Sequence, residues 1–143
     1  MKIDRTGSAV WEGALRDGQG AISTQSGALR QYPYGFASRF EGKPGTNPEE
    51  LIGAAHAGCF SMALALMLTE ARHPARRLET TAQVTLEQIQ GGYAITAVRL
   101  TLHADVPGIE RSEFERLAAE AKAGCPVSKL LKANITLDAT LAA

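Results

Sequence analysis

The chain has 143 residues, of which 45% are apolar and 21% charged, and this balance is typical of one soluble globular domain. Fifteen basic residues offset fifteen acidic residues, so no net field favours nucleic acid or an anionic membrane as a partner. The first residues lack the apolar core of a signal peptide, and we expect a cytoplasmic protein with reduced thiols or a redox pair. We treat residues 1–143 as a single domain.

Short strands are predicted for the first 40 residues. The runs "SAVWEGAL" and "GAISTQSGAL" flank the turn signal Asp17-Gly18, and they are predicted to pair as a hairpin. The segment "YPYGFASRF" mixes aromatic residues with Pro and Gly, which predicts an irregular edge or a short strand near Phe36–Phe40.

A long helix is predicted to follow. Asn47 suits the N-cap, Pro48 suits the first helical position, and Glu50 suits the acid of a capping box. We expect the helix to end near Arg72–His73, because Pro74 cannot continue it. The apolar run at 51–68 has the minimum length of a membrane span, but the sequence favours a buried core helix because nothing else in the chain resembles a membrane protein.

The sequence pattern of the second half of the chain predicts a hairpin, two helices and a strand. Residues 79–90 and 93–106 alternate in polarity around the turn Gly91-Gly92. Residues 110–124 predict a helix capped by Ser112, residues 126–133 a short helix, and residues 134–142 a final strand. This order predicts an α+β fold with a largely antiparallel sheet.

The chain has two cysteines, Cys59 and Cys125, and local chemistry leaves their role open. Cys59 lies in the apolar helix, where cysteines commonly pack as small hydrophobes and where burial predicts a raised thiol pKa unless a cation lies close. Cys125 lies between Gly and Pro, is expected to cap the short helix, and is locally the more reactive of the two. His56 shares a helix face with Cys59, yet no further ligand spacing supports a metal site.

Several segments together resemble one family. The motifs "YPYGF", "SRFEG", "GTNPEELIGAAHAGCFSMAL", "VPGI" and "AKAGCPVSKLLKANITLDATL" are similar to those of the osmotically inducible protein C family (OsmC), which is related to the organic hydroperoxide resistance proteins (Ohr). The resemblance covers essentially the whole chain, and the His56-containing motif is more like the OsmC branch. It implies antiparallel sheets with a long central buried helix, in an intertwined homodimer.

The resemblance also implies a thiol-dependent peroxidase, active in stress defence, that reduces organic hydroperoxides and also hydrogen peroxide. Cys59 is then the peroxidatic cysteine and Cys125 the resolving cysteine, and the two form a disulfide that an external dithiol reduces, for which the resemblance suggests a lipoyl-type compound. Arg39 is implied to stabilise the Cys59 thiolate, and Glu49 to orient Arg39. No metal or other cofactor is implied. Phe36, Phe40, Phe60, Met62 and Met67 are candidates to line the substrate pocket.

Helix geometry adds a quaternary expectation. Glu49 and Cys59 are ten residues apart, which is about 15 Å of helix rise and roughly 80° of rotation. If Arg39 contacts both residues, a second chain is expected to supply one of the groups. The alternatives are a redox sensor, a disulfide reductase lacking a CxxC motif, or a non-enzymatic assembly module whose cysteines are buried and inert.

Overall fold

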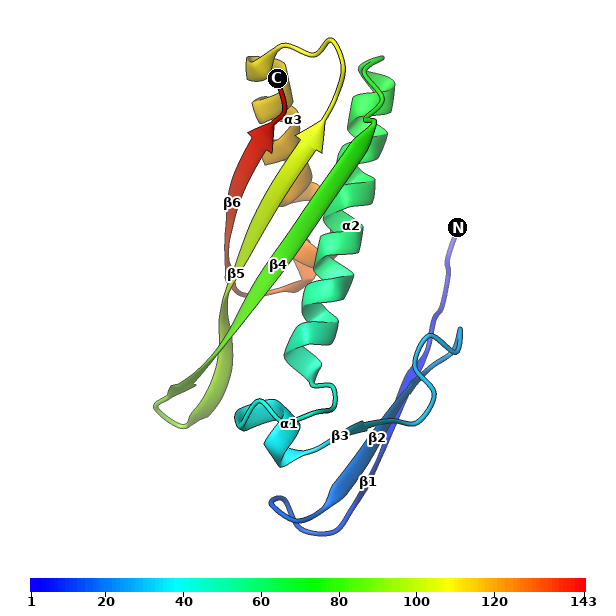
Figure 1. Cartoon of the computed structure of the whole chain (residues 1–143), viewed down its shortest axis with the longest axis vertical. Helices are drawn as coiled ribbons and strands as arrows, with labels where there is room; N and C mark the ends of the chain where they lie inside the picture. Colours follow the sequence, from blue (N-terminus) through cyan, green and yellow to red (C-terminus); the bar gives the residue numbers. More distant parts are fainter. The chain divides into compact units, whose positions relative to one another are not determined.

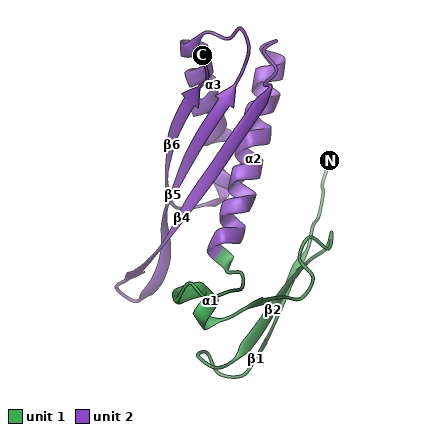
Figure 2. Ribbon diagram, in the orientation of Figure 1, with its two compact units in different colours: residues 1–48 green, residues 49–143 purple.

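A computed structural model describes all 143 residues and confirms a mixed α+β fold with two three-stranded sheets and a long helix (Figure 1). The chain divides into two compact units, residues 1–48 and 49–143 (Figure 2). The elements in chain order are β1 (Gly7–Glu12), β2 (Gln19–Thr24), β3 (Tyr32–Tyr34), α1 (Phe36–Phe40), α2 (Pro48–Glu70), β4 (Arg77–Ile89), β5 (Gly92–Asp105), α3 (Arg111–Gly124), α4 (Pro126–Leu130) and β6 (Asn134–Leu141).

The first unit is an antiparallel sheet in the order β1-β2-β3, followed by the short helix α1. The predicted hairpin of β1 and β2 is confirmed, but the predicted strand near Phe36–Phe40 is wrong, because this segment is helical. Ser38 explains the helical turn: its hydroxyl accepts the Gly35 N–H at 2.9 Å and lies 2.8 Å from the Thr46 carbonyl oxygen. The spacing of Phe36 and Phe40, whose ring centroids are 4.9 Å apart, also suits one helical turn.

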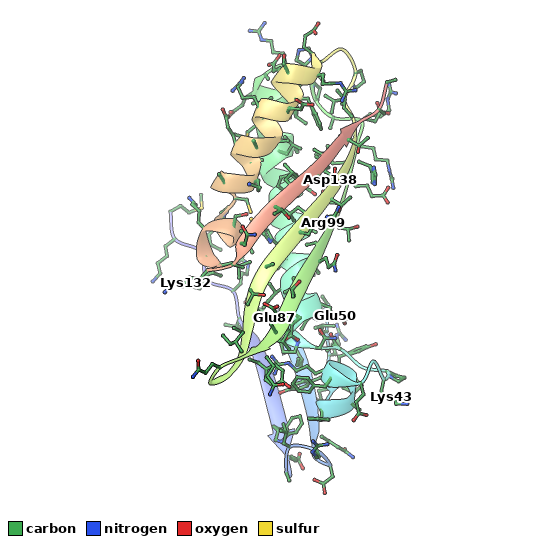
Figure 3. The ribbon with its side chains drawn as sticks, turned by 90° about the vertical axis from the view of Figure 1, so that its left-hand side faces the viewer. Lys43, Glu50, Glu87, Arg99, Lys132 and Asp138 are labelled. Carbon is green, nitrogen blue, oxygen red and sulfur yellow. The ribbon has the colours of Figure 1, made fainter.

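The second unit contains a sheet in the order β4-β5-β6. The predicted hairpin of β4 and β5 is confirmed, and Gly91 and Gly92 adopt the positive φ angles of 93° and 140° that favour glycine. The final strand β6 forms as predicted but pairs parallel to β5, so this sheet is mixed. Figure 3 shows Arg99 of β5 and Asp138 of β6, whose side chains form an exposed ion pair at 3.3 Å across that parallel pairing.

The long helix α2 begins at Pro48 as predicted and ends at Glu70, two residues before the predicted end. Arg72 takes a positive φ of 65°, and the His73 N–H donates to the Leu68 carbonyl at 2.8 Å. The left-handed Arg72 stops the helix before Pro74, and the His73 N–H satisfies one of the carbonyls that a helix end leaves without a partner.

The shorter helices α3 and α4 also form where the sequence predicts helices. The expected cap at Ser112 is wrong: the N-cap is Glu110, whose carbonyl accepts the Phe114 N–H at 3.0 Å, so Ser112 already lies in the first turn. The predicted apolar stripe of α3 is confirmed by the buried residues Phe114, Leu117, Ala118 and Ala121.

The core of the second unit lies between its sheet and its helices. Phe60, Leu64 and Leu68 of α2 pack with the α3 stripe against the inward face of β5, formed by Val98, Leu100, Leu102 and Ala104. Gly53 lets α2 approach β4, because a Cβ atom at this position would lie 3.0 Å from the Ala82 carbonyl oxygen. Each large side chain that is fully buried here contributes about 1.5–3 kcal/mol.

The other face of α2 is apolar but exposed in the single chain. Met62 retains 77% and Leu66 60% of its side-chain exposure, so the expected burial of this helix holds for one face only. By length and composition α2 could cross a membrane, but core helices of soluble proteins pass the same test, so this is weak evidence.

Candidate active site

The fold of the second unit brings the two cysteines together. Cys59 lies in the middle of α2 and Cys125 between α3 and α4, and the two thiols are close enough for Cys125 to raise the pKa of Cys59. Both are free thiols, and Cys125 is fully buried whereas Cys59 is partly exposed. Two thiols in contact form the arrangement from which a disulfide can close without a large backbone movement.

The backbone around Cys125 explains how it is held. Its N–H donates to the Ala121 carbonyl at 2.9 Å and closes α3, and Pro126 then occupies the first position of α4. The Cys125 sulfur accepts the Ser128 N–H at 3.3 Å, which confirms the prediction that Cys125 caps the short helix.

The surroundings of Cys59 disfavour its thiolate within this unit. Burial among apolar side chains raises the pKa of the Cys59 thiol, a hydrogen bond to the Val127 backbone lowers it, and the contact with Cys125 raises it further. The net shift is upward, as the sequence predicted. A cation from outside these contacts is therefore needed to make Cys59 a strong nucleophile at neutral pH.

A mostly apolar cavity of about 630 Å³ opens beside Cys59. Met62 and Met67 line it, as predicted, together with Leu66 of the same helix and Pro126 of α4. The prediction for Phe60 is wrong, because its side chain is fully buried in the core and does not line this cavity. The cavity suits an apolar ligand that places a polar group at the Cys59 sulfur.

Arg39 lies in the first unit, on helix α1. Its guanidinium lies 5.4 Å from the centre of the Phe40 ring, a distance typical of a cation–π contact. Phe36 and Phe40 line an apolar cavity of about 320 Å³ together with Arg39, and their place in a pocket with Cys59 stays a prediction. The pairing of Arg39 with Cys59 joins residues of different units and stays a prediction.

Glu49 lies in the first turn of α2 and is buried, with 8% of its surface exposed. Because α2 is continuous from Pro48 to Glu70, Glu49 and Cys59 are separated by about 15 Å along its axis. The carboxylate of Glu49 therefore does not reach the Cys59 sulfur of its own helix.

His56 and Ser128 form a contact that sequence reasoning missed. His56 is fully buried, its Nε2 lies 2.7 Å from the Ser128 hydroxyl, and that hydroxyl lies 3.2 Å from the Cys125 sulfur. Burial lowers the pKa of His56 below its ordinary value. The spacing of Cys125 and Ser128, a cap and its third following residue, was a signal for the contact between those two residues but not for the contact of Ser128 with His56.

Comparison with known proteins identifies the family. The sequence profile of the family described as OsmC-like protein matches residues 40–140. The chain is 56% identical over 138 residues to the Peroxiredoxin OsmC of Escherichia coli, covering 96% of both chains. It is 33% identical over 102 residues to the Organic hydroperoxide resistance protein of Xanthomonas axonopodis pv. citri, covering 71% of this chain and 70% of that one.

Comparison with solved structures supports the same family. The crystal structure of the organic hydroperoxide resistance protein OhrB of Bacillus subtilis superposes with a TM-score of 0.69 at 27% identity, covering 94% of this chain and 98% of that chain. With a family profile that spans most of its length and a relative of the same length at 56% identity, the chain belongs to the OsmC family.

Proposed function

We propose that this protein is a thiol-dependent peroxidase that reduces organic hydroperoxides through Cys59 and Cys125. The single observation that carries the proposal is the contact of two free thiols at the edge of an apolar cavity. Relatives named as a peroxiredoxin and as an organic hydroperoxide resistance protein support the same chemistry. The activity is an antioxidant one, and residues 1–143 act as a single domain in the cytoplasm, without a nucleic-acid or membrane partner.

The first step oxidises Cys59. Its thiolate attacks the distal oxygen of the hydroperoxide, the O–O bond breaks, and the alkoxide leaves as an alcohol after protonation. Cys59 becomes a sulfenic acid. The apolar cavity favours an alkyl hydroperoxide, whereas hydrogen peroxide reacts without gaining from contact with Met62, Leu66 and Met67.

The second step closes a disulfide. Cys125 attacks the Cys59 sulfur, and the hydroxyl of the sulfenic acid leaves as water. An external dithiol, for which we propose a lipoyl-type compound, then reduces the disulfide by thiol–disulfide exchange. A dithiol suits this task because its second sulfur releases the mixed disulfide within the same molecule.

Arg39 and Glu49 complete the proposed site. The guanidinium of Arg39 offsets the upward shift of the Cys59 pKa, because a nearby positive charge stabilises the thiolate, and the Glu49 carboxylate orients Arg39. The separation of about 15 Å between Glu49 and Cys59 supports a homodimer in which two subunits build each site. The exposed apolar residues Met62 and Leu66 support burial of α2 against the second subunit.

The test is steady-state turnover with matched substrates and reductants. The protein is mixed with cumene hydroperoxide or hydrogen peroxide, and with dihydrolipoamide or a monothiol such as glutathione. We expect turnover with the dithiol, and a higher kcat/KM for cumene hydroperoxide than for hydrogen peroxide. No consumption of either peroxide with any thiol would favour the alternative of an assembly module with inert cysteines, and stoichiometric oxidation without turnover would favour a redox sensor.

A further inference from the structure

The fully buried histidine His56 is not used by the proposed cycle. It lies one turn before Cys59 on α2, on the helix face that packs against the core. A fully buried polar ring in a core costs free energy unless it is hydrogen-bonded. Its Nε2 lies 2.7 Å from the Ser128 hydroxyl, and its Nδ1 has no hydrogen-bond partner.

The lone partner of His56 determines which ring nitrogen carries the proton. The low pKa that burial gives His56 keeps the ring neutral, so one nitrogen donates and the other accepts. A buried N–H without an acceptor is rarer and more costly than a buried acceptor without a donor. The proton therefore lies on Nε2, and Nε2–H donates to the Ser128 oxygen.

This assignment orients the Ser128 hydroxyl. With one lone pair of its oxygen engaged by His56, Ser128 directs its own proton to the Cys125 sulfur, 3.2 Å away. The Ser128 N–H donates to the same sulfur at 3.3 Å. The Cys59 thiol also lies beside this sulfur, and the proximity of Cys125 raises the Cys59 pKa.

We propose that His56 and Ser128 form a donor relay that positions the Cys125 sulfur and stabilises negative charge on it during disulfide closure. Hydrogen bonds to a charged acceptor are about twice as strong as neutral ones, so the relay strengthens as charge develops on sulfur. His56 is a positioning residue, since it acts on Cys125 only through Ser128. This inference rests on the proposed function, in which Cys125 is the resolving cysteine.

The disulfide-closing step that the relay assists needs no reactant other than the two cysteine groups. A lone pair of the Cys125 sulfur forms the S–S bond, and the S–O bond of the Cys59 sulfenic acid breaks. The hydroxide that leaves Cys59 and the proton that leaves the Cys125 thiol together make one water molecule. Cys125 is oxidised and the Cys59 sulfenic acid is reduced, so no further oxidant is required.

Single-turnover kinetics without a reductant tests the relay, because the two steps are measured separately. The protein reacts with one equivalent of cumene hydroperoxide, samples are quenched in acid, and intact mass distinguishes the gain of one oxygen from the loss of two hydrogens. We expect Ser128→Ala to close the disulfide about tenfold more slowly, which corresponds to a rise of roughly 1.4 kcal/mol in the activation free energy of closure. The rate of Cys59 oxidation should not change. Ser128→Thr, which keeps the hydroxyl, should restore most of the rate.

The histidine is tested by a pair of variants of similar size. His56→Leu removes the donor and should slow closure about threefold, whereas His56→Gln keeps an amide N–H for Ser128 and should stay near the rate of the unmodified protein. Ser61→Ala is the matched control. Ser61 lies on the same helix as His56, and its hydroxyl lies 2.7 Å from the hydroxyl of Thr80 on β4, so the substitution removes a hydroxyl contact without touching Cys125. Thermal unfolding of each variant shows whether it is folded.

The outcomes separate this inference from the proposed function. If the unmodified protein forms neither the sulfenic acid nor the disulfide, the proposed function fails. If it forms both, and closure in folded Ser128→Ala is as fast as in Ser61→Ala, the relay is refuted while the function stands. Equal slowing of both steps in Ser128→Ala would also refute the relay, because a general disturbance of the site would explain it. Should His56→Leu not fold, the Ser128→Ala and Ser128→Thr pair decides the question.

Discussion

The middle of α2 and the junction between α3 and α4 each supply one cysteine, and they surround the two sulfurs differently. Cys59 lies among apolar side chains beside an open cavity, and burial raises the pKa of its thiol. Cys125 is fully buried, and its sulfur accepts a hydrogen bond from the Ser128 N–H and lies 3.2 Å from the Ser128 hydroxyl. One sulfur is accessible to an apolar substrate, while the other is held in a polar cradle that solvent does not reach.

This difference between the two cysteines suits two different roles in one reaction cycle. Access to substrate is needed at the sulfur that meets the peroxide, and a fixed orientation is needed at the sulfur that closes the disulfide. Burial among apolar side chains makes the environment of Cys59 unfavourable for its thiolate, and Arg39 is proposed to offset this effect. The comparison between the two cysteines therefore predicts distinct consequences when each environment is altered.

The largest effect is expected for Cys59→Ser. Without the sulfur at the cavity, no sulfenic acid forms, and peroxidase turnover should fall to the background rate of the thiol reductant alone. Consumption of cumene hydroperoxide with dihydrolipoamide measures this. Ser61→Ala, two residues away on α2, serves as the control and should keep its activity. Full steady-state activity in Cys59→Ser would remove Cys59 from the mechanism.

Cys125→Ser should separate the two roles. Cys59 remains, so one equivalent of peroxide is reduced and a sulfenic acid accumulates, but the dithiol has no disulfide to recycle. Dimedone, which reacts with sulfenic acids, should label Cys59 in this variant and label the unmodified protein far less. Equal labelling of both proteins would mean that Cys125 does not resolve the sulfenic acid.

Arg39→Ala should affect Cys59 and leave Cys125 unchanged. Loss of the positive charge raises the apparent pKa of Cys59 further, because the thiolate loses its stabilising partner. The pH profile of Cys59 alkylation by iodoacetamide in the Cys125→Ser background should shift to higher pH. Arg99→Ala, which removes only an exposed ion pair with Asp138, is the control and should leave the profile in place. An unchanged profile in Arg39→Ala would argue against its proposed role.

The smallest effect is expected on the pH dependence of the unfolding free energy, through His56. Burial lowers the pKa of His56 in the folded protein, so the unfolded chain binds more protons than the folded one below the ordinary histidine pKa of about 6.5. The contribution of neutral His56 is fully present above that pH and is lost as pH falls through the folded pKa. His56→Gln should therefore flatten the pH dependence of the urea unfolding free energy below about pH 6.5. Parallel curves for the two proteins would contradict the cause assigned to this shift.

Local sequence signals predicted most of the fold. Pro48 marked the start of α2, the alternation around Gly91-Gly92 marked the hairpin of β4 and β5, and Gly124-Cys125-Pro126 marked a helix cap. These features succeed because each depends on neighbours along the chain. Phe36–Phe40 failed as a predicted strand because its helical turn depends on a hydrogen bond from Ser38 to Thr46, eight residues away.

Local sequence signals predicted less of the candidate site than of the fold. The sequence chemistry of Cys59 alone favoured packing, and only the family resemblance paired it with Cys125. The contact of His56 with Ser128 joins positions 72 residues apart, so no periodicity or spacing could reveal it. The parallel direction of β6 is also a tertiary property, since its alternating pattern suits either direction of pairing.

The central claim is that Cys59 and Cys125 act as one redox pair, and peptide mapping after a single turnover tests it most directly. The protein is treated with one equivalent of cumene hydroperoxide, quenched with an alkylating reagent, digested without reduction and analysed by mass spectrometry. We predict a peptide pair linked between residues 59 and 125, formed at one disulfide per equivalent of peroxide. Two alkylated thiols with the peroxide left intact would contradict the account.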